Sequence, residues 1–213
     1  MRIECYGATR KQDGHSTNED AFLIGRGSLP FAALCDGAGN AEKVAKKVLT
    51  LFQRMFNDAR SDEAGWDKFV SEDAWAKWVH LLDLFLLDSG ETTFIGAVAM
   101  GYLAVGAYVG DSRAYLIDSE GGCRLITVTE NKYRLGSGLA MASPIHVPLK
   151  PRDVFLLLTD GAWIPLSPYL IQRAVVNSMM KHFSDVPQAV LDAAGRTGRA
   201  DDMTAVALRI TEK

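Results

Sequence analysis

The stretch Phe31-Ala32-Ala33-Leu34-Cys35-Asp36-Gly37 places an apolar run directly before an aspartate and a glycine. A second stretch, Val154-Phe155-Leu156-Leu157-Leu158-Thr159-Asp160-Gly161, has the same arrangement. Short apolar runs that end at turn residues predict strands buried on both faces. Each stretch therefore predicts a core strand that leads into an acidic side chain.

Further strands are predicted around these two. They are residues 92–100, 103–109, 114–117 and 204–210, which are rich in apolar side chains. Gly101-Tyr102 separates the first two segments, and so short a separation predicts a hairpin. The third segment follows a turn at Gly110-Asp111, and the last follows Asp201-Asp202.

Amphipathic helices are predicted between the groups of strands. Apolar residues recur at helical spacing at Ala41, Val44, Ala45, Val48, Phe52, Met55 and Phe56. Further helices are predicted from Asp67 to about Leu87, and at 170–183 and 186–194 with Ser184-Asp185 as a cap between them. Because helices come in pairs between groups of strands, the order favours an α+β fold of sheets covered by helices over a regular βαβ alternation.

Composition narrows the class of protein. The chain of 213 residues has 23 Lys and Arg against 26 Asp and Glu, a formal charge of −3, and 48% hydrophobic residues. This balance excludes a disordered chain and argues against a nucleic-acid partner, which would favour a basic surface. Because neither a linker nor a repeat divides the sequence, residues 1–213 are predicted to form a single domain.

The cysteines and the apolar runs indicate in which cellular compartment the protein is expected. Cys5, Cys35 and Cys123 have no Cys-x-x-Cys spacing, which indicates neither a disulfide framework nor a zinc site and favours a reducing compartment. Cys35 is predicted to be a buried strand residue. The first residues lack the apolar core of a signal peptide, and no apolar run approaches the roughly 18 residues that span a bilayer. We therefore expect a cytoplasmic protein without a membrane span.

Acidic residues gather at the ends of the predicted strands. The set is Asp20, Asp36, Asp111, Asp160, Asp201 and Asp202. One interpretation is that Asp and Gly are ordinary turn residues. The other is that these strand ends converge, where burial and like charge disfavour ionised carboxylates unless divalent cations are present. Mg²⁺ and Mn²⁺ bind carboxylate and carbonyl oxygens, and a glycine after Asp36 leaves its own carbonyl accessible.

Five motifs follow one another in an order that resembles a known family. They are Asn18-Glu19-Asp20, Ala33-Leu34-Cys35-Asp36-Gly37-Ala38-Gly39, Glu91-Thr92-Thr93 leading into Val109-Gly110-Asp111-Ser112-Arg113-Ala114-Tyr115, Leu158-Thr159-Asp160-Gly161-Ala162-Trp163, and Asp201-Asp202-Met203-Thr204-Ala205-Val206. Together they resemble the metal-dependent protein phosphatases (PPM, the type 2C Ser/Thr phosphatases) over almost the whole chain. The resemblance implies a four-layer αββα sandwich, two antiparallel sheets flanked by helix pairs.

The resemblance implies that Asp36 bridges two Mn²⁺ or Mg²⁺ ions and that Asp160 and Asp201 hold the first ion. These three are the expected catalytic acids. Asp202 stands where the family usually has Asn, so Asp201 is preferred to it. A water bridging two such cations has a lowered pKa and would attack phosphorus directly, without a covalent intermediate. The expected reaction is the hydrolysis of phosphoserine and phosphothreonine in proteins.

Further metal contacts are implied around these acids. Gly37 would offer its carbonyl, while Glu19 and Asp20 would act mostly through metal-bound waters. Asp111 matches the acid that helps to hold a third, weaker ion in bacterial members of the family.

Three departures from the family concern phosphate binding and access. His15 stands where the family usually has a phosphate-clamping Arg, and a His brings charge only when it is protonated. Arg10 and Lys11 are the alternative phosphate-binding residues. Ala38 stands where some members have a His that serves as general acid, and the segment between Ile126 and Val154 is short, which implies a reduced flap.

Two functions therefore stay open. The leading hypothesis is a signalling hydrolase that removes phosphate from proteins modified by a Ser/Thr kinase system. The alternative, favoured by His15 and the short flap, is a catalytically weak or inactive module on the same fold that binds a phosphoprotein or a regulatory partner. A plain domain whose aspartates are turn residues would gain no stability from metal.

Overall fold

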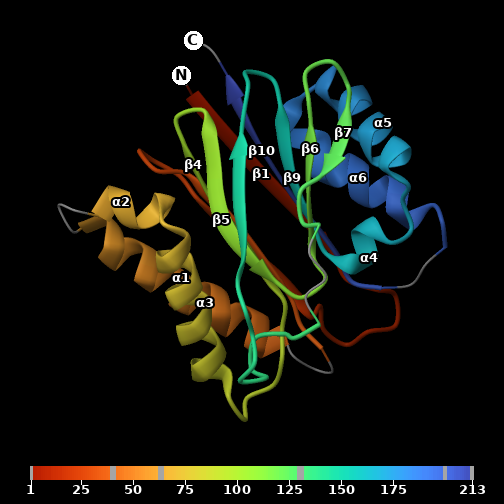
Figure 1. The fold of residues 1–213 in the computed structure, drawn as a ribbon. Coiled ribbons are helices and arrows are strands. Elements are labelled where there is room, and N and C mark those ends of the chain that lie inside the picture. Colours follow the sequence, from red (N-terminus) through yellow and green to blue (C-terminus); the bar gives the residue numbers. More distant parts are fainter. Residues whose placement is uncertain (1, 39–41, 62–64, 129–131, 199–200, 212–213) are drawn as a thin grey trace.

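The computed structural model describes residues 2–38, 42–61, 65–128, 132–198 and 201–211. Within these ranges the strands form two antiparallel sheets of five strands each, with helices on both sides (Figure 1). This arrangement confirms the predicted four-layer αββα sandwich. Gly39 of the Asp-Gly motif and Ala41 of the first predicted helix lie outside the described residues.

The first sheet has the strand order β2-β3-β4-β5-β8. Its strands are β2 (Asp20–Gly25), β3 (Phe31–Asp36), β4 (Phe94–Met100), β5 (Leu103–Val109) and β8 (Ser143–Pro148). The predicted hairpin joins β4 to β5, and Gly101 in its turn has a φ of 59°, a left-handed conformation that glycine adopts without a steric penalty. β8 lies in the segment predicted to be a reduced flap. Its prolines, Pro144 and Pro148, are tolerated because it is an edge strand.

The second sheet has the strand order β1-β10-β9-β6-β7. Its strands are β1 (Arg2–Arg10), β10 (Met203–Thr211), β9 (Val154–Leu158), β6 (Arg113–Ile117) and β7 (Cys123–Leu125). β1 pairs with β10 along its whole length, from Arg2 opposite Thr211 to Arg10 opposite Met203. The predicted strands at 114–117, 154–158 and 204–210 are confirmed.

Helices cover the outer face of each sheet. The first sheet is covered by α1 (Glu42–Ser61), α2 (Gly65–Val70) and α3 (Glu72–Leu86). The second is covered by α4 (Asp160–Trp163), α5 (Pro168–Met179) and α6 (Val186–Gly195), with a 3₁₀ turn at Phe183–Asp185. In Figure 1 the two groups lie on opposite sides of the strands.

The prediction of one continuous helix from Asp67 to about Leu87 is wrong at Ser71. That residue has an extended backbone, with φ −85° and ψ 120°, and its Oγ accepts a hydrogen bond from the N–H of Ala74 at 3.3 Å. Such an N-cap begins a new helix, so α2 and α3 are separate. The helix predicted at 170–183 also ends early, at Met179.

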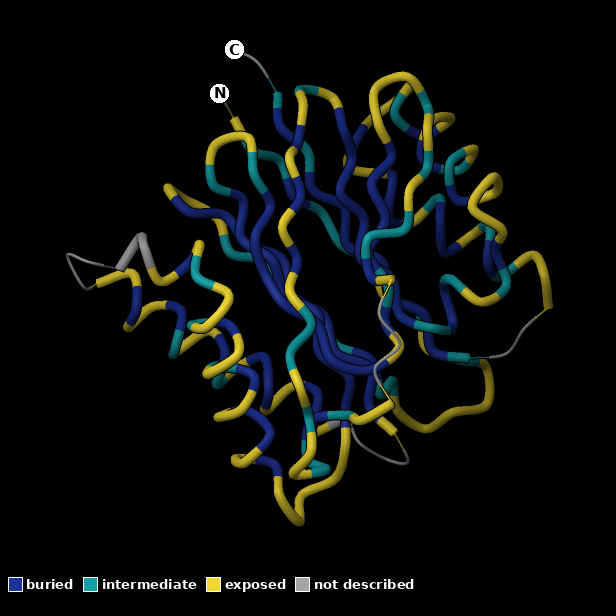
Figure 2. The backbone as a smooth tube through the Cα atoms, in the orientation of Figure 1, coloured by how far each residue is buried: buried dark blue, intermediate teal, exposed yellow. Residues whose placement is uncertain are grey.

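Three apolar layers hold the sandwich together, and β3 shows how one strand serves two of them. Phe31, Ala33 and Cys35 pack toward α1, α2 and α3, whereas Ala32 and Leu34 pack between the sheets. Successive side chains of a strand point to opposite faces, so a strand with a layer on each side is apolar throughout. Cys35 is fully buried, as predicted. Figure 2 shows the buried positions running along the strands and the exposed ones along the loops and outer helix faces.

Across the described ranges, we find no helix with the length and apolar character needed to cross a membrane.

Candidate metal centre

Antiparallel pairing brings the acidic strand ends of each sheet together. In the first sheet, Asp20 at the start of β2 is the register partner of Asp36 at the end of β3. In the second sheet, Leu158 at the end of β9 pairs with Arg113 of β6 and with Ala205 of β10. This register gathers at one end of the sheet the acids that adjoin these strands, namely Asp111, Asp160, Asp201 and Asp202.

A hydroxyl group joins the two sheets at this end. The Oγ1 of Thr159 donates a hydrogen bond of 2.8 Å to Oδ2 of Asp20, and it accepts one of 2.8 Å from the backbone N–H of Thr204. The Oγ1 of Thr204 also lies 2.8 Å from that of Thr9 in β1. Because Asp20, Thr159 and Thr204 are all buried, this chain of hydrogen bonds fixes Asp20 where the two sheets meet.

Burial and like charge disfavour the ionised forms of two of these acids. Burial, together with the charges of Asp20 and Asp160, raises the pKa of Asp36 to about 9, against the positive charge of Arg134. Burial raises the pKa of Asp20 to about 7, against a hydrogen bond from Thr159 that lowers it. Asp20 and Asp36 are therefore neighbours, as one of the two interpretations of the sequence expects, and the charge of Asp160 acts on both. A divalent cation beside them would reverse these shifts.

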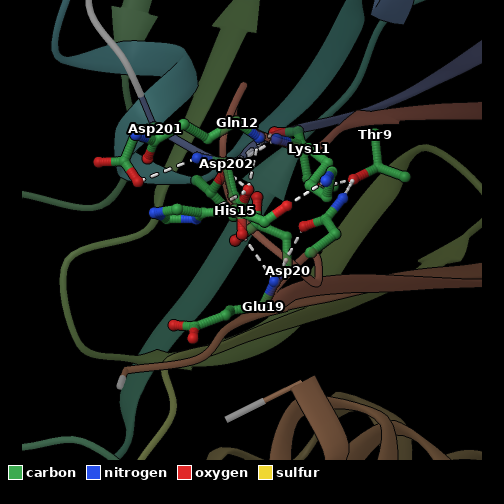
Figure 3. A network of polar contacts seen from close by, with 11 residues as sticks. Thr9, Lys11, Gln12, His15, Glu19, Asp20, Asp201 and Asp202 are labelled. Atoms are coloured by element: carbon green, nitrogen blue, oxygen red, sulfur yellow. Dashed lines mark hydrogen bonds and ion pairs between the residues drawn. The ribbon is translucent and has the colours of Figure 1, made fainter. Parts of the chain in front are cut away.

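Asp202 holds the loop that leads into β2. Its buried carboxylate accepts backbone N–H bonds from Gln12 at 2.7 Å and from Glu19 at 2.6 Å (Figure 3). Asp201 lies beside it, and its Oδ1 accepts the N–H of Asp202 at 2.9 Å. Both carboxylate oxygens of Asp202 thus accept hydrogen bonds from backbone N–H groups. Of the two aspartates, Asp201 stays the predicted metal ligand.

Gly161 allows α4 to begin next to this acidic pair. A Cβ atom at Gly161 would lie 2.1 Å from the carbonyl oxygen of Asp202 and 2.9 Å from Cβ of Asp201, which no side chain tolerates. The glycine after Asp160 is therefore required by a close approach between segments far apart in sequence. That requirement goes beyond the ordinary turn interpretation of this Asp-Gly pair.

The backbone of Asp36 is held by two threonines that the sequence motif contains but for which no role was predicted. Its N–H donates to Oγ1 of Thr93 at 2.9 Å, and its carbonyl accepts from Oγ1 of Thr92 at 2.8 Å. The Oγ1 of Thr93 lies 2.8 Å from Oγ of Ser112, the residue after Asp111. These hydroxyls tie the Asp111 turn to the end of β3.

Glu19 and Gly37 meet through the backbone. The N–H of Gly37 donates to the carbonyl of Glu19 at 3.2 Å, and Gly37 also pairs with Thr92 in an isolated β-bridge. These contacts place both residues beside Asp36. The metal contacts predicted for the Gly37 carbonyl and for the Glu19 side chain stay predictions.

The three residues predicted to bind phosphate all contact other groups. Arg10 forms an ion pair with Asp192 of α6, and its Nη1 donates to the carbonyl of Leu191 at 3.3 Å. Lys11 donates to the carbonyl of His15. Nδ1 of His15 lies 3.6 Å from Oδ1 of Asp202, with the side chain 43% exposed. The side chain of Arg10, at the end of β1, thus contacts α6, whereas His15 lies beside the acidic residues.

Arg134 is a cation at this site that the sequence reasoning missed. Its Nη2 lies 3.1 Å from Oδ2 and 3.3 Å from Oδ1 of Asp111. The charges of Asp111 and Asp36, opposed by burial, raise the pKa of this guanidinium. Because Arg134 belongs to no motif, only the tertiary structure places it here.

The donor set suits a hard divalent cation without enclosing one. Among the described residues, no three histidine, cysteine or acidic side chains lie close enough together to hold an ion. Mg²⁺ and Mn²⁺ keep several waters and accept carbonyl ligands. A site based on Asp36 would therefore be completed by waters and by carbonyls such as that of Gly37, and the residues present fit such an ion.

Two cavities adjoin the acidic residues. One of about 500 Å³ is lined by Asp20 and by Lys46 of α1. Another of about 460 Å³ is lined by Asp111 with Arg113, Lys132 and Trp163. A larger cavity of about 860 Å³ is lined by residues 25–28 at the far end of β2, away from the acidic residues. The candidate site is therefore identified by its acidic side chains and not by the volume of its cavity.

No family model matches the sequence, and no curated protein matches it either. Solved structures do match. The chain is similar to the S. agalactiae serine/threonine phosphatase with a TM-score of 0.80 and 19% identity, covering 98% of this chain and 100% of that one. It is similar to the catalytic domain of the phosphatase PstP in complex with two manganese ions, with a TM-score of 0.76, 19% identity and 99% of each chain covered. A structure from the bacterial stressosome matches with a TM-score of 0.74 and 17% identity over 98% of this chain and 100% of that one. Over nearly its whole length, this chain therefore has the fold of the PPM Ser/Thr phosphatases.

Proposed function

We propose that this chain is a single-domain, metal-dependent phosphatase that hydrolyses phosphoserine and phosphothreonine in proteins. The observation that carries the proposal is the buried Asp36, which faces Asp20 across the sheet and is acted on by the charge of Asp160. Support comes from the fold, since similar structures include a Ser/Thr phosphatase and a PstP catalytic domain with two manganese ions.

The residues that would hold two Mn²⁺ or Mg²⁺ ions are those predicted from the sequence. Asp36 would contact both ions, with Asp160 and Asp201 on the first ion and the Gly37 carbonyl beside them. Asp20 and Glu19 would act through waters. When bound, such ions lower the pKa of a water and offset the negative charge of the phosphate.

In this proposal the protein positions the metal-binding carboxylates and does not itself provide the nucleophile. Thr159 holds Asp20, and Thr92 and Thr93 hold the backbone of Asp36, so the carboxylates keep their places as charge changes nearby. Cys35, next to Asp36, is fully buried, and burial raises the pKa of its thiol. A buried neutral thiol is a poor nucleophile, which favours direct attack by water without a covalent intermediate.

The cellular setting follows from the same chemistry. A phosphoprotein substrate must come from a Ser/Thr kinase reaction, so a cognate kinase is the proposed counterpart. Cys5, Cys35 and Cys123 are free thiols, and this supports a reducing compartment and hence the cytoplasm.

The test is hydrolysis of an aryl phosphate and of a phosphothreonine peptide with added Mn²⁺. We expect activity that a chelator abolishes and that Asp36→Asn lowers by more than about 100-fold. Asp58→Asn, on the exposed face of α1, is the matched control and should keep full activity. Activity that survives both the chelator and Asp36→Asn would contradict the proposed mechanism.

A second function deserves the same assay. Arg10 and Lys11 contact other protein groups, and a stressosome structure shares the fold. A regulatory module that binds a phosphoprotein without turnover would bind Mn²⁺ and yet hydrolyse neither substrate. Hydrolysis by the purified chain would exclude this alternative.

A further inference from the structure

Arg134 reaches the acidic end of the sandwich from the segment between β7 and β8. Its Nη2 contacts both carboxylate oxygens of Asp111, at 3.1 and 3.3 Å. Its charge also acts on Asp36 and Asp160. A permanent positive charge therefore lies among the acids that the proposed function assigns to metal ions.

The loop that carries Arg134 is held in place from two sides. Leu135, the next residue, exchanges backbone hydrogen bonds of 3.1 and 2.9 Å with Thr92, the residue that also binds the Asp36 carbonyl. Asp83 of α3, which is 1% exposed, accepts backbone N–H bonds from the same loop. The donors are Gly136 at 2.7 Å, Gly138 at 3.2 Å and Ala140 at 3.1 Å. Asp83 is thus a positioning residue for the Arg134 loop.

The turn that carries Asp111 is held as firmly. The indole Nε1 of Trp163 donates to the carbonyl of Asp111 at 3.0 Å. The guanidinium of Arg113 lies 3.3 Å from the centre of the Trp163 ring. With Ser112 hydrogen-bonded to Thr93, both partners of the ion pair stand on backbone that is fixed at the site.

We propose that the guanidinium of Arg134 takes the place of a third divalent cation at Asp111, so that this chain functions with two ions and a built-in arginine. The inference rests on the proposed function, since Asp111 matters here only beside a two-ion phosphate site. An arginine remains charged at every physiological pH and can bond both oxygens of a carboxylate. A cation on the same two oxygens would be repelled by it. The site thereby keeps a positive charge that does not depend on the metal concentration.

The experiment counts bound Mn²⁺ per chain by equilibrium dialysis, with calorimetry for affinity. The wild-type chain should bind two equivalents, as in the PstP complex. Asp111→Asn should leave that number unchanged, because its carboxylate binds Arg134 rather than metal. Arg134→Gln should add a weaker third equivalent, which the double variant Arg134→Gln/Asp111→Asn should lose. Arg124→Gln on β7, with an exposed side chain, is the matched control and should bind as the wild type does.

The outcomes separate this inference from the proposed function. A third equivalent in the wild type that Asp111→Asn removes would overturn the inference, and so would an Arg134→Gln chain that still binds two. Phosphopeptide hydrolysis is measured on the same samples. A chain with the expected Mn²⁺ counts and no hydrolysis would contradict the proposed function while supporting the role of Arg134. A chain that binds no Mn²⁺ in any form would contradict both.

Discussion

Two groups of buried aspartates in this molecule have opposite surroundings. Asp83 and Asp153 are 1% and 3% exposed, and each accepts backbone N–H bonds. Asp20 and Asp36 are also buried, at 5% and 9% exposed, yet they face each other. The charge of Asp160 acts on both of them, and that of Asp202 acts on Asp20. The first group organises loops, whereas the second group accumulates negative charge.

The difference shows that burial of an acid does not by itself indicate a functional site. A carboxylate that accepts several N–H bonds is stable as an anion inside a protein. One that faces other carboxylates is stable only when it is protonated or when a cation is present. The partners of Asp36 therefore distinguish it from Asp83.

The largest expected effect on stability comes from the loop-organising group. Asp83→Ala leaves the N–H groups of Gly136, Gly138 and Ala140 without their acceptor. Gly136 and Ala140 are half-buried and Gly138 is exposed, so water replaces part of the lost bonding. At about 1 kcal/mol for each donor, we expect a loss of about 3 kcal/mol in the free energy of unfolding, measured by urea denaturation.

Two variants sharpen this result. Asp83→Asn keeps one acceptor oxygen and should lose less stability than Asp83→Ala. Asp58→Ala on the exposed face of α1 should change stability little. A loss below about 1 kcal/mol in Asp83→Ala would show that the loop finds other acceptors, and the contrast between the two groups would fail.

Mn²⁺ should separate the two groups next. At about 100 times its dissociation constant, a ligand that binds only the folded state adds about 2.7 kcal/mol to the free energy of unfolding. We expect Asp36→Asn to lose most of this gain and Asp153→Asn to keep it, although Asp153→Asn starts from a less stable chain. Equal Mn²⁺ responses in the two variants would place the metal away from Asp36.

Part of the fold and of the acidic site can be predicted from local sequence patterns. The strands β3 and β9 follow from apolar runs, and the acids at their ends follow from the Asp-Gly pairs, because local patterns specify both. The convergence of Asp20 with Asp36 stays open at the level of sequence, because no strand is predicted at 20–25. It is decided by the pairing of β2 with β3, which places the start of one strand beside the end of the other.

Other features depend on contacts between distant segments. Arg10 of β1 pairs with Asp192, which lies 182 positions later, and no local pattern indicates this ion pair. A role of Arg10 in phosphate binding stays a prediction. Arg134 and Asp83 belong to no motif. Only the folded chain brings Arg134 to Asp111 and Asp83 to the loop that carries Arg134. The edge strand β8 is hard to predict from the sequence because it contains two prolines, which are uncommon in strands. The break before α3 is hard to predict because it depends on a single N-cap residue, Ser71.

The pH dependence of stability gives a smaller effect with a definite sign. In the metal-free folded chain the pKa of Asp36 is about 9, against 3.8 as its ordinary value. Between these values the unfolded chain releases a proton that the folded chain retains, so stability falls as pH rises. The contribution is fully present below about pH 4 and is lost through pH 9, with a slope of at most about 1.4 kcal/mol per pH unit.

Urea denaturation of the chelated protein between pH 5 and 9 checks this sign. The free energy of unfolding of the wild type minus that of Asp36→Asn should decrease steadily with pH, because Asn does not titrate. The difference between the wild type and Asp58→Asn should stay nearly constant. A difference for Asp36→Asn that grows with pH would mean that the folded chain stabilises the Asp36 anion without metal.

The smallest effect is expected at Asp111, which belongs to neither group. Its side chain is 50% exposed and its partner Arg134 is 23% exposed, so solvent screens the pair. Exposed ion pairs contribute about 0–1 kcal/mol, and Asp111→Asn should lower the free energy of unfolding by less than about 1 kcal/mol. A loss as large as that of Asp83→Ala would show that Asp111 is a structural acid. A small loss is expected if the role of Asp111 is to position Arg134. The contact between the two side chains then sets the charge at the site and adds little to the stability of the sandwich.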